Sequence, residues 1–392
     1  MKHLCCSRRQ FLRIGAAAAA ATQLPFHLRA EEPPPRRRNA AVSITSCRTY
    51  NVADVRAALD KNFDLIGGIG SLVKNKTVTV KLNLTGSMFD PFLGRPPGET
   101  FITHPSTGAA LAAALFAAGA RRVRFVESTN LKEPLATTLR RTGWDVTALQ
   151  SLGKMEFENT RNLGFGKDYA TLKVPGGGHL FSSFDLNRSY HDTDVFVSLC
   201  KLKLHATAGV TLTMKNLFGI TPNSLYGDEA PDENGTQGRG KIHDLTGWEP
   251  ARQNVMPYDP PGATRRFFET RDGTMRIPRV VSEICGARPI HLGIIDGITS
   301  MNVAEGPWCP GPKKFVSPGV IIAGVDPVAT DAVGTAVMGF DNPRAPRGTV
   351  PFDFCDNHLL LAEQAGLGTA DLSRIDVASV PLATARSKEY RS

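Results

Sequence analysis

Within this chain the sequence reads Val78-Thr79-Val80-Lys81-Leu82-Asn83-Leu84, an apolar and β-branched run that is typical of a buried strand. The Ala- and Leu-rich stretch 105–118 follows and predicts a helix, with Gly119 at the position of a C-terminal cap. Residues 122–126 predict the next strand. A strand, a helix and a strand in that order predict a right-handed crossover and a largely parallel sheet.

The same alternation continues along the chain. Residues 131–141 predict a helix that ends at Gly143, and residues 146–149 a further strand. Strand-like runs follow at 195–204, 290–295 and 320–325, with helical segments after Arg279 and Pro327. We therefore predict an α/β fold in which helices flank a largely parallel sheet.

One long stretch interrupts this pattern. Residues 223–276 are dense in Gly, Pro, Asn and Asp and have almost no apolar periodicity. Irregular stretches of this length are uncommon unless they are functional or mobile, so we predict a long irregular insertion that could serve as a lid. Residues 43–385 are predicted to form one α/β domain that includes this insertion, although two lobes would also fit the length.

The N-terminus carries Ser7-Arg8-Arg9-Gln10-Phe11-Leu12-Arg13, and residues 14–28 contain no charged side chain. This order predicts a twin-arginine signal peptide over residues 1–30, handled by the Tat translocase, with export to the periplasm. Cleavage after Ala30 would suit it, although Leu28 stands where a small residue is preferred. The poly-Ala run is too short and too weakly apolar for a membrane span, so we expect no stable span after cleavage.

Most of the basic character of the chain belongs to this signal. The formal net charge is +9, and residues 1–30 carry five basic residues and no acidic one, which leaves +4. Residues 31–42 contain a Pro run and Arg36-Arg37-Arg38 and are predicted to be a solvated linker. Since no other basic tract follows, we expect no nucleic-acid partner.

Seven cysteines occur in the chain, and five of them follow the signal. They are widely spaced and form no Cys-x-x-Cys pair, so we expect no iron–sulfur cluster. The identity of any cofactor stays open, and a divalent metal ion remains compatible with the sequence.

The most suggestive segment for function is Val195-Phe196-Val197-Ser198-Leu199-Cys200-Lys201-Leu202-Lys203-Leu204-His205. If it is extended throughout, its apolar face continues into Lys201, Lys203 and His205 at the C-terminal end. Open α/β sheets bind ligands at this edge, so the pattern predicts a site for a small anion. A strand end running into solvent, with hydrated lysines, would give the same pattern.

Seven short motifs occur in the order seen in the family called domain of unknown function 362, and the chain resembles that family from about residue 78 to its C-terminus. They are Lys81-Leu82-Asn83-Leu84-Thr85, Thr103-His104-Pro105, Lys201-Leu202-Lys203-Leu204-His205, Thr211-Leu212-Thr213-Met214-Lys215-Asn216-Leu217-Phe218-Gly219, Ile295-Asp296-Gly297-Ile298, Glu305-Gly306-Pro307 and Asp326-Pro327-Val328-Ala329-Thr330-Asp331. The resemblance implies an α/β fold and no particular reaction. Many relatives carry a ferredoxin-like cysteine cluster that this chain lacks, and Leu82 replaces the proline of the usual Lys-Pro-Asn motif.

These positions share a chemical character. Lys81 and Asn83 alternate with leucines and would point to one face near a strand end. His104 precedes a predicted helix whose N-terminal amides could hold an anion, although an N-cap role explains it equally well. Asp296 ends a strand before Gly297, where it could orient a lysine or bind a metal; a turn residue would look the same.

Two function classes follow from these residues. The first is an enzyme acting on a small anionic substrate, in which Lys203, His205 or Lys215 moves a proton. The second is a non-catalytic binding or maturation protein for a small anion, a metal or a partner protein. Further side chains are predicted to bind the substrate: Lys81, Asn83, His104, Lys201, Asn216, His243 in the insertion, and Glu305 in a Gly/Pro-rich loop.

Overall fold

The computed structural model describes residues 40–235, 238–243, 259–270 and 272–391. The predicted signal, residues 1–30, and most of the predicted linker lie outside these ranges, as does the segment 244–258 of the predicted lid. One compact unit spans Asn39–Ser392.

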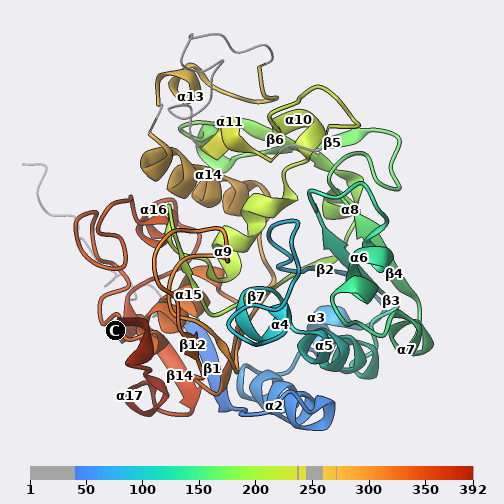
Figure 1. Ribbon diagram of the computed structural model, residues 1–392, viewed down its shortest axis with the longest axis vertical. Helices are drawn as coiled ribbons and strands as arrows, with labels where there is room; N and C mark the ends of the chain where they lie inside the picture. Colours follow the sequence, from blue (N-terminus) through green and yellow to red (C-terminus); the bar gives the residue numbers. More distant parts are fainter. Residues whose placement is uncertain (1–39, 236–237, 244–258, 271, 392) are drawn as a thin grey trace, which may run out of the picture. The chain divides into compact units, whose positions relative to one another are not determined.

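A mixed sheet of eight strands forms the centre of this unit, in the order β14-β1-β13-β10-β7-β2-β3-β4 (Figure 1). Its strands are β1 (Ala40–Ser46), β2 (Thr77–Lys81), β3 (Arg122–Glu127), β4 (Met155–Asn159), β7 (Val195–Lys201), β10 (Leu292–Gly297), β13 (Val320–Gly324) and β14 (Ile375–Ser379). Neighbouring strands are parallel except at β13, which is antiparallel to β1 and to β10. The predicted α/β fold with a largely parallel sheet is therefore confirmed.

The strand–helix–strand unit around the quoted segment forms as expected. β2 is buried along its whole length and pairs in parallel with β3. Between them runs α5 (Pro105–Ala117), where His104 caps the N-terminus and Pro105 occupies the first turn. Gly119 follows this helix with φ of +93°, a conformation that residues with a Cβ rarely adopt.

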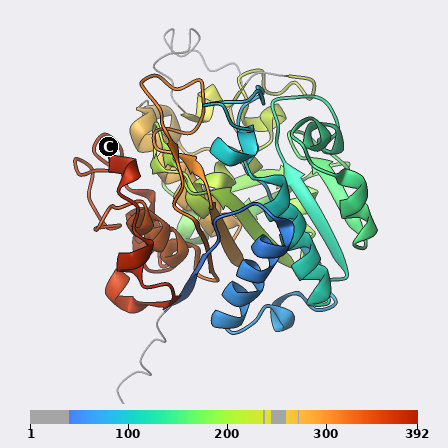
Figure 2. The ribbon, with the colours of Figure 1, turned by 60° about the horizontal axis from the view of Figure 1, so that its bottom comes forward.

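Helices cover both faces of the sheet (Figures 1 and 2). α2 (Val52–Leu65) and α5 pack together on one face, against apolar side chains of β2, β3 and β7. α9 (Leu212–Asn216), α14 (Gly273–Ala287) and α15 (Pro327–Val337) pack on the other. Because both faces are covered, the central strands β2, β7 and β10 are buried along their whole length, including their polar residues.

The remaining elements are short. They are α3 (Gly70–Val73), α4 (Pro97–Thr100), α6 (Leu135–Arg141), α7 (Val146–Ser151), α8 (Arg188–His191), α10 (Asn223–Tyr226), α11 (Gly240–His243), α13 (Arg265–Glu269), α16 (His358–Gln364), α17 (Leu382–Ala385), four 3-10 turns, and the strand pairs β5 (Tyr169–Lys173) with β6 (Ser183–Asn187), β8 (Leu204–His205) with β9 (Gly209–Val210), and β11 (Ser300–Met301) with β12 (Phe315–Val316). Among the described residues, no helix combines the length and the apolar composition that crossing a membrane requires.

Two local predictions are wrong. Residues 146–149 form part of helix α7 rather than a strand, because Asp145 caps the N-terminus by accepting a hydrogen bond from the Ala148 amide at 2.9 Å. The segment 195–205 is not extended throughout. β7 ends at Lys201, and β8 turns away to pair with β9.

The core around α5 generates a stability prediction. A Cβ on Gly108 would lie 2.2 Å from the Trp144 ring, whereas one on Gly70 would meet nothing within 4 Å. Gly108→Ala should therefore lower the free energy of unfolding by about 1–3 kcal/mol, although alanine is the better helix former. Gly70→Ala should stay within about 1 kcal/mol of wild type. Urea denaturation checks both, and equal stability of the two variants would contradict this packing.

Candidate functional site

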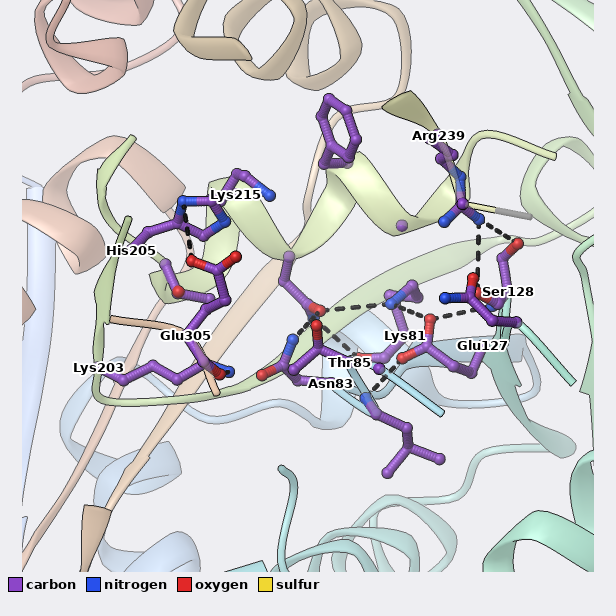
Figure 3. Close-up of a pocket in the computed structure, with 18 of the residues that line it drawn as sticks. Lys81, Asn83, Thr85, Glu127, Ser128, Lys203, His205, Lys215, Arg239 and Glu305 are labelled. Atoms are coloured by element: carbon purple, nitrogen blue, oxygen red, sulfur yellow. Dashed lines mark hydrogen bonds and ion pairs between the residues drawn. The ribbon is translucent and has the colours of Figure 1, made fainter. Parts of the chain in front are cut away.

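A cavity of about 230 Å³ opens at the edge of the sheet where β2 and β3 end and where the chain leaves β7. Ligands of open α/β sheets bind at this edge. Among its lining residues are many of those singled out from the sequence, drawn in part in Figure 3: Lys81, Asn83, Lys203, His205, Lys215, Asn216, His243 and Glu305. The fold thus brings together side chains from four separate sequence motifs and from the predicted lid.

The floor of the cavity is a buried ion pair between the ends of β2 and β3. Lys81 Nζ lies 2.5 Å from Glu127 Oε1 and donates to the Leu82 carbonyl oxygen at 2.7 Å. The Glu127 carboxylate also accepts from the backbone amides of Leu84 and Ser128. Burial lowers the pKa of Lys81, and the neighbouring carboxylate opposes this effect. Lys81 is therefore held by the protein itself.

Asn216 joins this floor to α9. Its Oδ1 accepts hydrogen bonds from Asn83 Nδ2 at 3.1 Å and from Lys81 Nζ at 3.3 Å, and its Nδ2 donates to Ser198 Oγ at 3.1 Å. The Oδ1 of Asn83 is buried and has no hydrogen-bond partner in the part of the chain that the structure describes. Asn83 therefore offers a free acceptor beside the cavity.

Lys215 differs from Lys81 because no carboxylate lies in direct contact with it, and Glu305 acts on its charge only from a distance. Within the described ranges its ammonium makes no hydrogen bond or ion pair, and it lies 4.4 Å from the centre of the Phe218 ring. Burial lowers its pKa to about 8. A largely buried cation without an acceptor is costly unless an anion joins it.

Lys203 is also fully buried but is held by backbone oxygens. Its Nζ donates to the carbonyl oxygens of Phe101 at 2.7 Å and Glu305 at 2.8 Å. Burial lowers its pKa to about 7. The Nζ atom is tetrahedral: one of its four positions is the bond to the side chain, and two are the N–H groups that donate to these carbonyl oxygens. The fourth position carries a lone pair when the amine is neutral and a third N–H when it is charged.

His205 is neutral in this environment. Its Nδ1 accepts a hydrogen bond from the Thr207 amide at 3.1 Å, and burial lowers its pKa well below the usual value. The Glu305 carboxylate lies 3.5 Å from the same nitrogen and accepts from the Ala206 amide at 2.8 Å. Because Nδ1 is already an acceptor, the His205–Glu305 contact is not an ion pair, and the proton of the neutral ring resides on Nε2.

Residues of the predicted lid form the opposite wall. Arg239 donates from Nε to the Thr221 carbonyl oxygen at 2.7 Å and from one terminal nitrogen to the hydroxyl of Ser128. Its pKa falls to about 10 through burial, so it stays charged at neutral pH. His243, on α11, packs its ring 4.5 Å from that of Phe218, and burial lowers its pKa to about 3.

Arg239, Ser128 and Asn130 also line the cavity, although no sequence motif pointed to them, and Trp308 lines it as well. Arg239 lies in Gly238-Arg239-Gly240, four residues before His243. Its proximity to this predicted site histidine is the one feature of the sequence that could have indicated a role in the cavity. Trp308 directly follows Glu305-Gly306-Pro307, so its position beside a family motif was the available signal.

Three predicted site residues, Lys201, Asp296 and His104, do not line this cavity. Lys201 and Asp296 form a fully buried ion pair at 3.1 Å. Tyr50 and Thr107 also donate to the Asp296 carboxylate, each at 3.0 Å. His104 stacks on Tyr50 and caps α5 by accepting from the Ser106 amide. Lys201 points to the α2 and α5 face of the sheet, and the chain turns before Lys203, so the two lysines do not share one site.

From its sequence context, Asp296 is also a candidate metal ligand. Its two oxygens accept hydrogen bonds from three side chains and from the Ile298 amide. Over the described ranges, no group of three or more His, Cys, Asp or Glu side chains could hold a metal ion. The geometry of Asp296 therefore fits a structural ion pair better than a metal centre.

Asp331 positions the helix that carries Lys215. From α15 its carboxylate accepts hydrogen bonds from the amides of Thr213 and Met214, each at 2.8 Å, and from the Thr213 hydroxyl at 2.6 Å. α9 begins at Leu212 with φ of +45°, a conformation that costs a residue with a Cβ about 1 kcal/mol or more. Burial raises the pKa of Asp331 to about 7, and these hydrogen bonds oppose it. Asp331 thus acts as a remote N-terminal cap for α9.

This role generates a testable difference between two aspartates. Asp331→Ala should lower the free energy of unfolding by about 2–5 kcal/mol, because two buried amides lose their acceptor. Asp145→Ala removes an exposed cap of α7 and should cost about 1 kcal/mol. Urea denaturation measures the free energy of unfolding of both variants. Similar losses of stability in the two would mean that Asp331 does not hold α9.

Part of the chain is similar in sequence to a known protein, and its N-terminus matches a known signal. A thylakoid-associated protein of Synechocystis is 29% identical over 196 residues, which cover 47% of this chain. The chain thus matches about half, 52%, of that relative's length. A twin-arginine translocation signal model matches residues 6–25, which indicates export across a membrane by the Tat translocase.

Two solved structures are similar at low TM-scores. The lactate racemase apoprotein from Thermoanaerobacterium thermosaccharolyticum has a TM-score of 0.36 and 14% identity, over 67% of this chain and 52% of that one. A Thermotoga maritima protein has a TM-score of 0.35 and 14% identity, over 72% and 57%. Scores this low carry no conclusion about function.

A family model gives the clearest relationship. The model described as a domain of unknown function, DUF362, matches residues 78–336, more than half of the chain. The matched range contains every cavity residue described above. The chain belongs to the DUF362 family.

Proposed function

We propose that this exported protein is an enzyme that binds a small anionic substrate in the cavity and uses Lys203 to move a proton. We place it in the periplasm, in keeping with its twin-arginine signal. The observation that carries the proposal is Lys215, a largely buried ammonium that faces the cavity without an acceptor in the described part of the chain.

The charge balance of the cavity supports an anionic ligand. Lys81 is matched by Glu127, and Glu305 provides one further carboxylate for Lys203 and Lys215. Both histidines are neutral, so they add hydrogen-bonding groups without adding charge. An anion would compensate the remaining positive charge and replace water around the buried lysines.

Lys203 suits proton transfer better than its neighbours do. A pKa of about 7 provides both the amine and the ammonium at neutral pH, which is the condition for a general base and a general acid. The two carbonyl oxygens fix the orientation of the amine. Its remaining position can then accept a proton from a bound substrate or return one. Strongly perturbed lysines in a cleft favour an enzyme over a simple binding protein.

Replacement of Lys215 tests the anion site. Lys215→Met should weaken the binding of propionate or inorganic phosphate at least about tenfold, because a charged hydrogen bond is lost. The melting temperature should stay unchanged or rise, since the variant no longer buries a cation without a partner. Isothermal calorimetry and thermal denaturation measure the two effects.

Lys61→Met is the matched control, because Lys61 is exposed on α2. It should leave anion binding unchanged. Wild-type protein that binds neither anion, or a Lys215 variant that binds as tightly as wild type, would contradict the proposed site.

The pH dependence separates the enzyme from a simple binding protein. Propionate stays ionised above pH 6, so changes in affinity report on the protein. Affinity should be highest below pH 7 and fall as the pH rises through about 7 and 8, where Lys203 and Lys215 lose their protons. Calorimetric titrations between pH 6 and pH 9.5 measure this decline. Constant affinity over the range would mean lysines of ordinary pKa, which would favour the non-catalytic alternative.

A further inference from the structure

Resting on the proposed function, we infer that the substrate carries two acidic groups at opposite ends, one held by Lys203 and Lys215 and the other by Arg239. Figure 3 shows the basis for this inference: Lys203, Lys215 and His205 lie on one side of the cavity, and Arg239 and Ser128 lie on the other.

At the first end, the positive groups outnumber the negative ones by one. Lys203 and Lys215 both line the cavity, and Glu305 is the carboxylate that acts on both of them. His205 is neutral with its proton on Nε2, a nitrogen for which the described residues provide no acceptor. Two amines and one imidazole N–H can therefore surround one acidic group of the substrate.

The second end repeats this balance with different residues. Lys81 and Arg239 are its cations, and Glu127 is the carboxylate that lines it. Glu127 lies 2.5 Å from Lys81 and acts on Arg239 only from a greater distance, so one positive charge remains in excess and Arg239 has no direct ion pair in the described part of the chain. Outside the cavity wall, Arg161 and Asp228 act on Arg239 with opposite signs.

Arg239 is oriented for a ligand. Thr221 fixes its Nε and Ser128 fixes one terminal nitrogen. The other terminal nitrogen has no acceptor in the described part of the chain and belongs to a residue that lines the cavity. A guanidinium held in this way presents a planar, permanently charged donor, which suits a carboxylate or a phosphate.

The space between the two ends suits a short carbon chain. The Phe218 ring lies 4.4 Å from Lys215 Nζ and 4.5 Å from the His243 ring, and it provides an apolar wall above the floor made by Lys81 and Asn216. A single water needs about 10–15 Å³ of such volume, so a cavity of about 230 Å³ has room for a small organic molecule rather than one inorganic ion. A molecule with an acidic group at each end would satisfy both unmatched charges.

The test compares acids that differ only in the second acidic group. Wild-type protein is titrated with succinate, glutarate and adipate, and with butyrate, pentanoate and hexanoate as partners of equal chain length. At least one dicarboxylate should bind about tenfold or more tightly than its monocarboxylate partner, since Arg239 adds a charged hydrogen bond. Arg239→Gln should remove this preference and leave monocarboxylate binding in place. Lys215→Met should weaken both classes.

Two further variants keep the result interpretable. Arg265→Gln is the matched control, because the Arg265 side chain is 92% exposed on α13 and should not affect either class. Arg239→Lys retains a cation and should retain part of the preference, which covers the case in which Arg239→Gln fails to fold.

The outcomes distinguish this inference from the proposed function. Equal affinity for every matched pair, with binding that still depends on Lys215, would overturn the inference and leave the anion site intact. A dicarboxylate preference that survives in a folded Arg239→Gln variant would also overturn it. If no acid of either class binds, both proposals fail.

Discussion

The buried ion pair between Lys81 and Glu127 is the interaction on which the cavity depends. It joins the ends of two neighbouring parallel strands, and both side chains are at most 4% exposed. Removing two charges from water is costly, and the pair is tolerated because the remaining donors and acceptors also have partners at Leu82, Leu84 and Ser128. Losing one partner of such a pair typically costs about 3–5 kcal/mol. These bonds fix the chain just beyond β2 and β3, where the floor of the cavity forms.

The other lysines are placed by elements far away in the sequence. α15 contributes Asp331, which holds the start of α9 and so places Lys215 and Asn216 against the floor. Lys203 is held by backbone oxygens near α4 and in the loop around Glu305. Burial keeps the nearby histidines neutral, so they do not add positive charge beside these lysines. The result is a cationic cavity whose charges are only partly compensated by the protein.

The sequence predicted much of this arrangement and failed in specific places. Alternation along β7 correctly indicated that a cationic group follows the strand, and the family motifs pointed to Lys215 and Asn216. Alternation did not reveal that the strand ends at Lys201, and in the structure Lys203 lines the cavity whereas Lys201 does not. Its partner Asp296 was placed at the correct edge of the sheet, but the identity of its donors depends on Tyr50 and Thr107, which are distant in sequence.

By itself, the sequence determined the strand–helix–strand alternation, the parallel character of most of the sheet and the export signal. These properties are local, because strand and helix patterns and a signal peptide are written in consecutive residues. Only the tertiary structure decided which charged groups neutralise one another and which remain free. Lys81, Lys201 and Lys215 look alike in sequence, yet two are paired with carboxylates and the third faces the cavity. That difference arises because packing between residues distant in the sequence decides which lysines are desolvated and which meet a carboxylate, and a short sequence pattern does not encode these contacts.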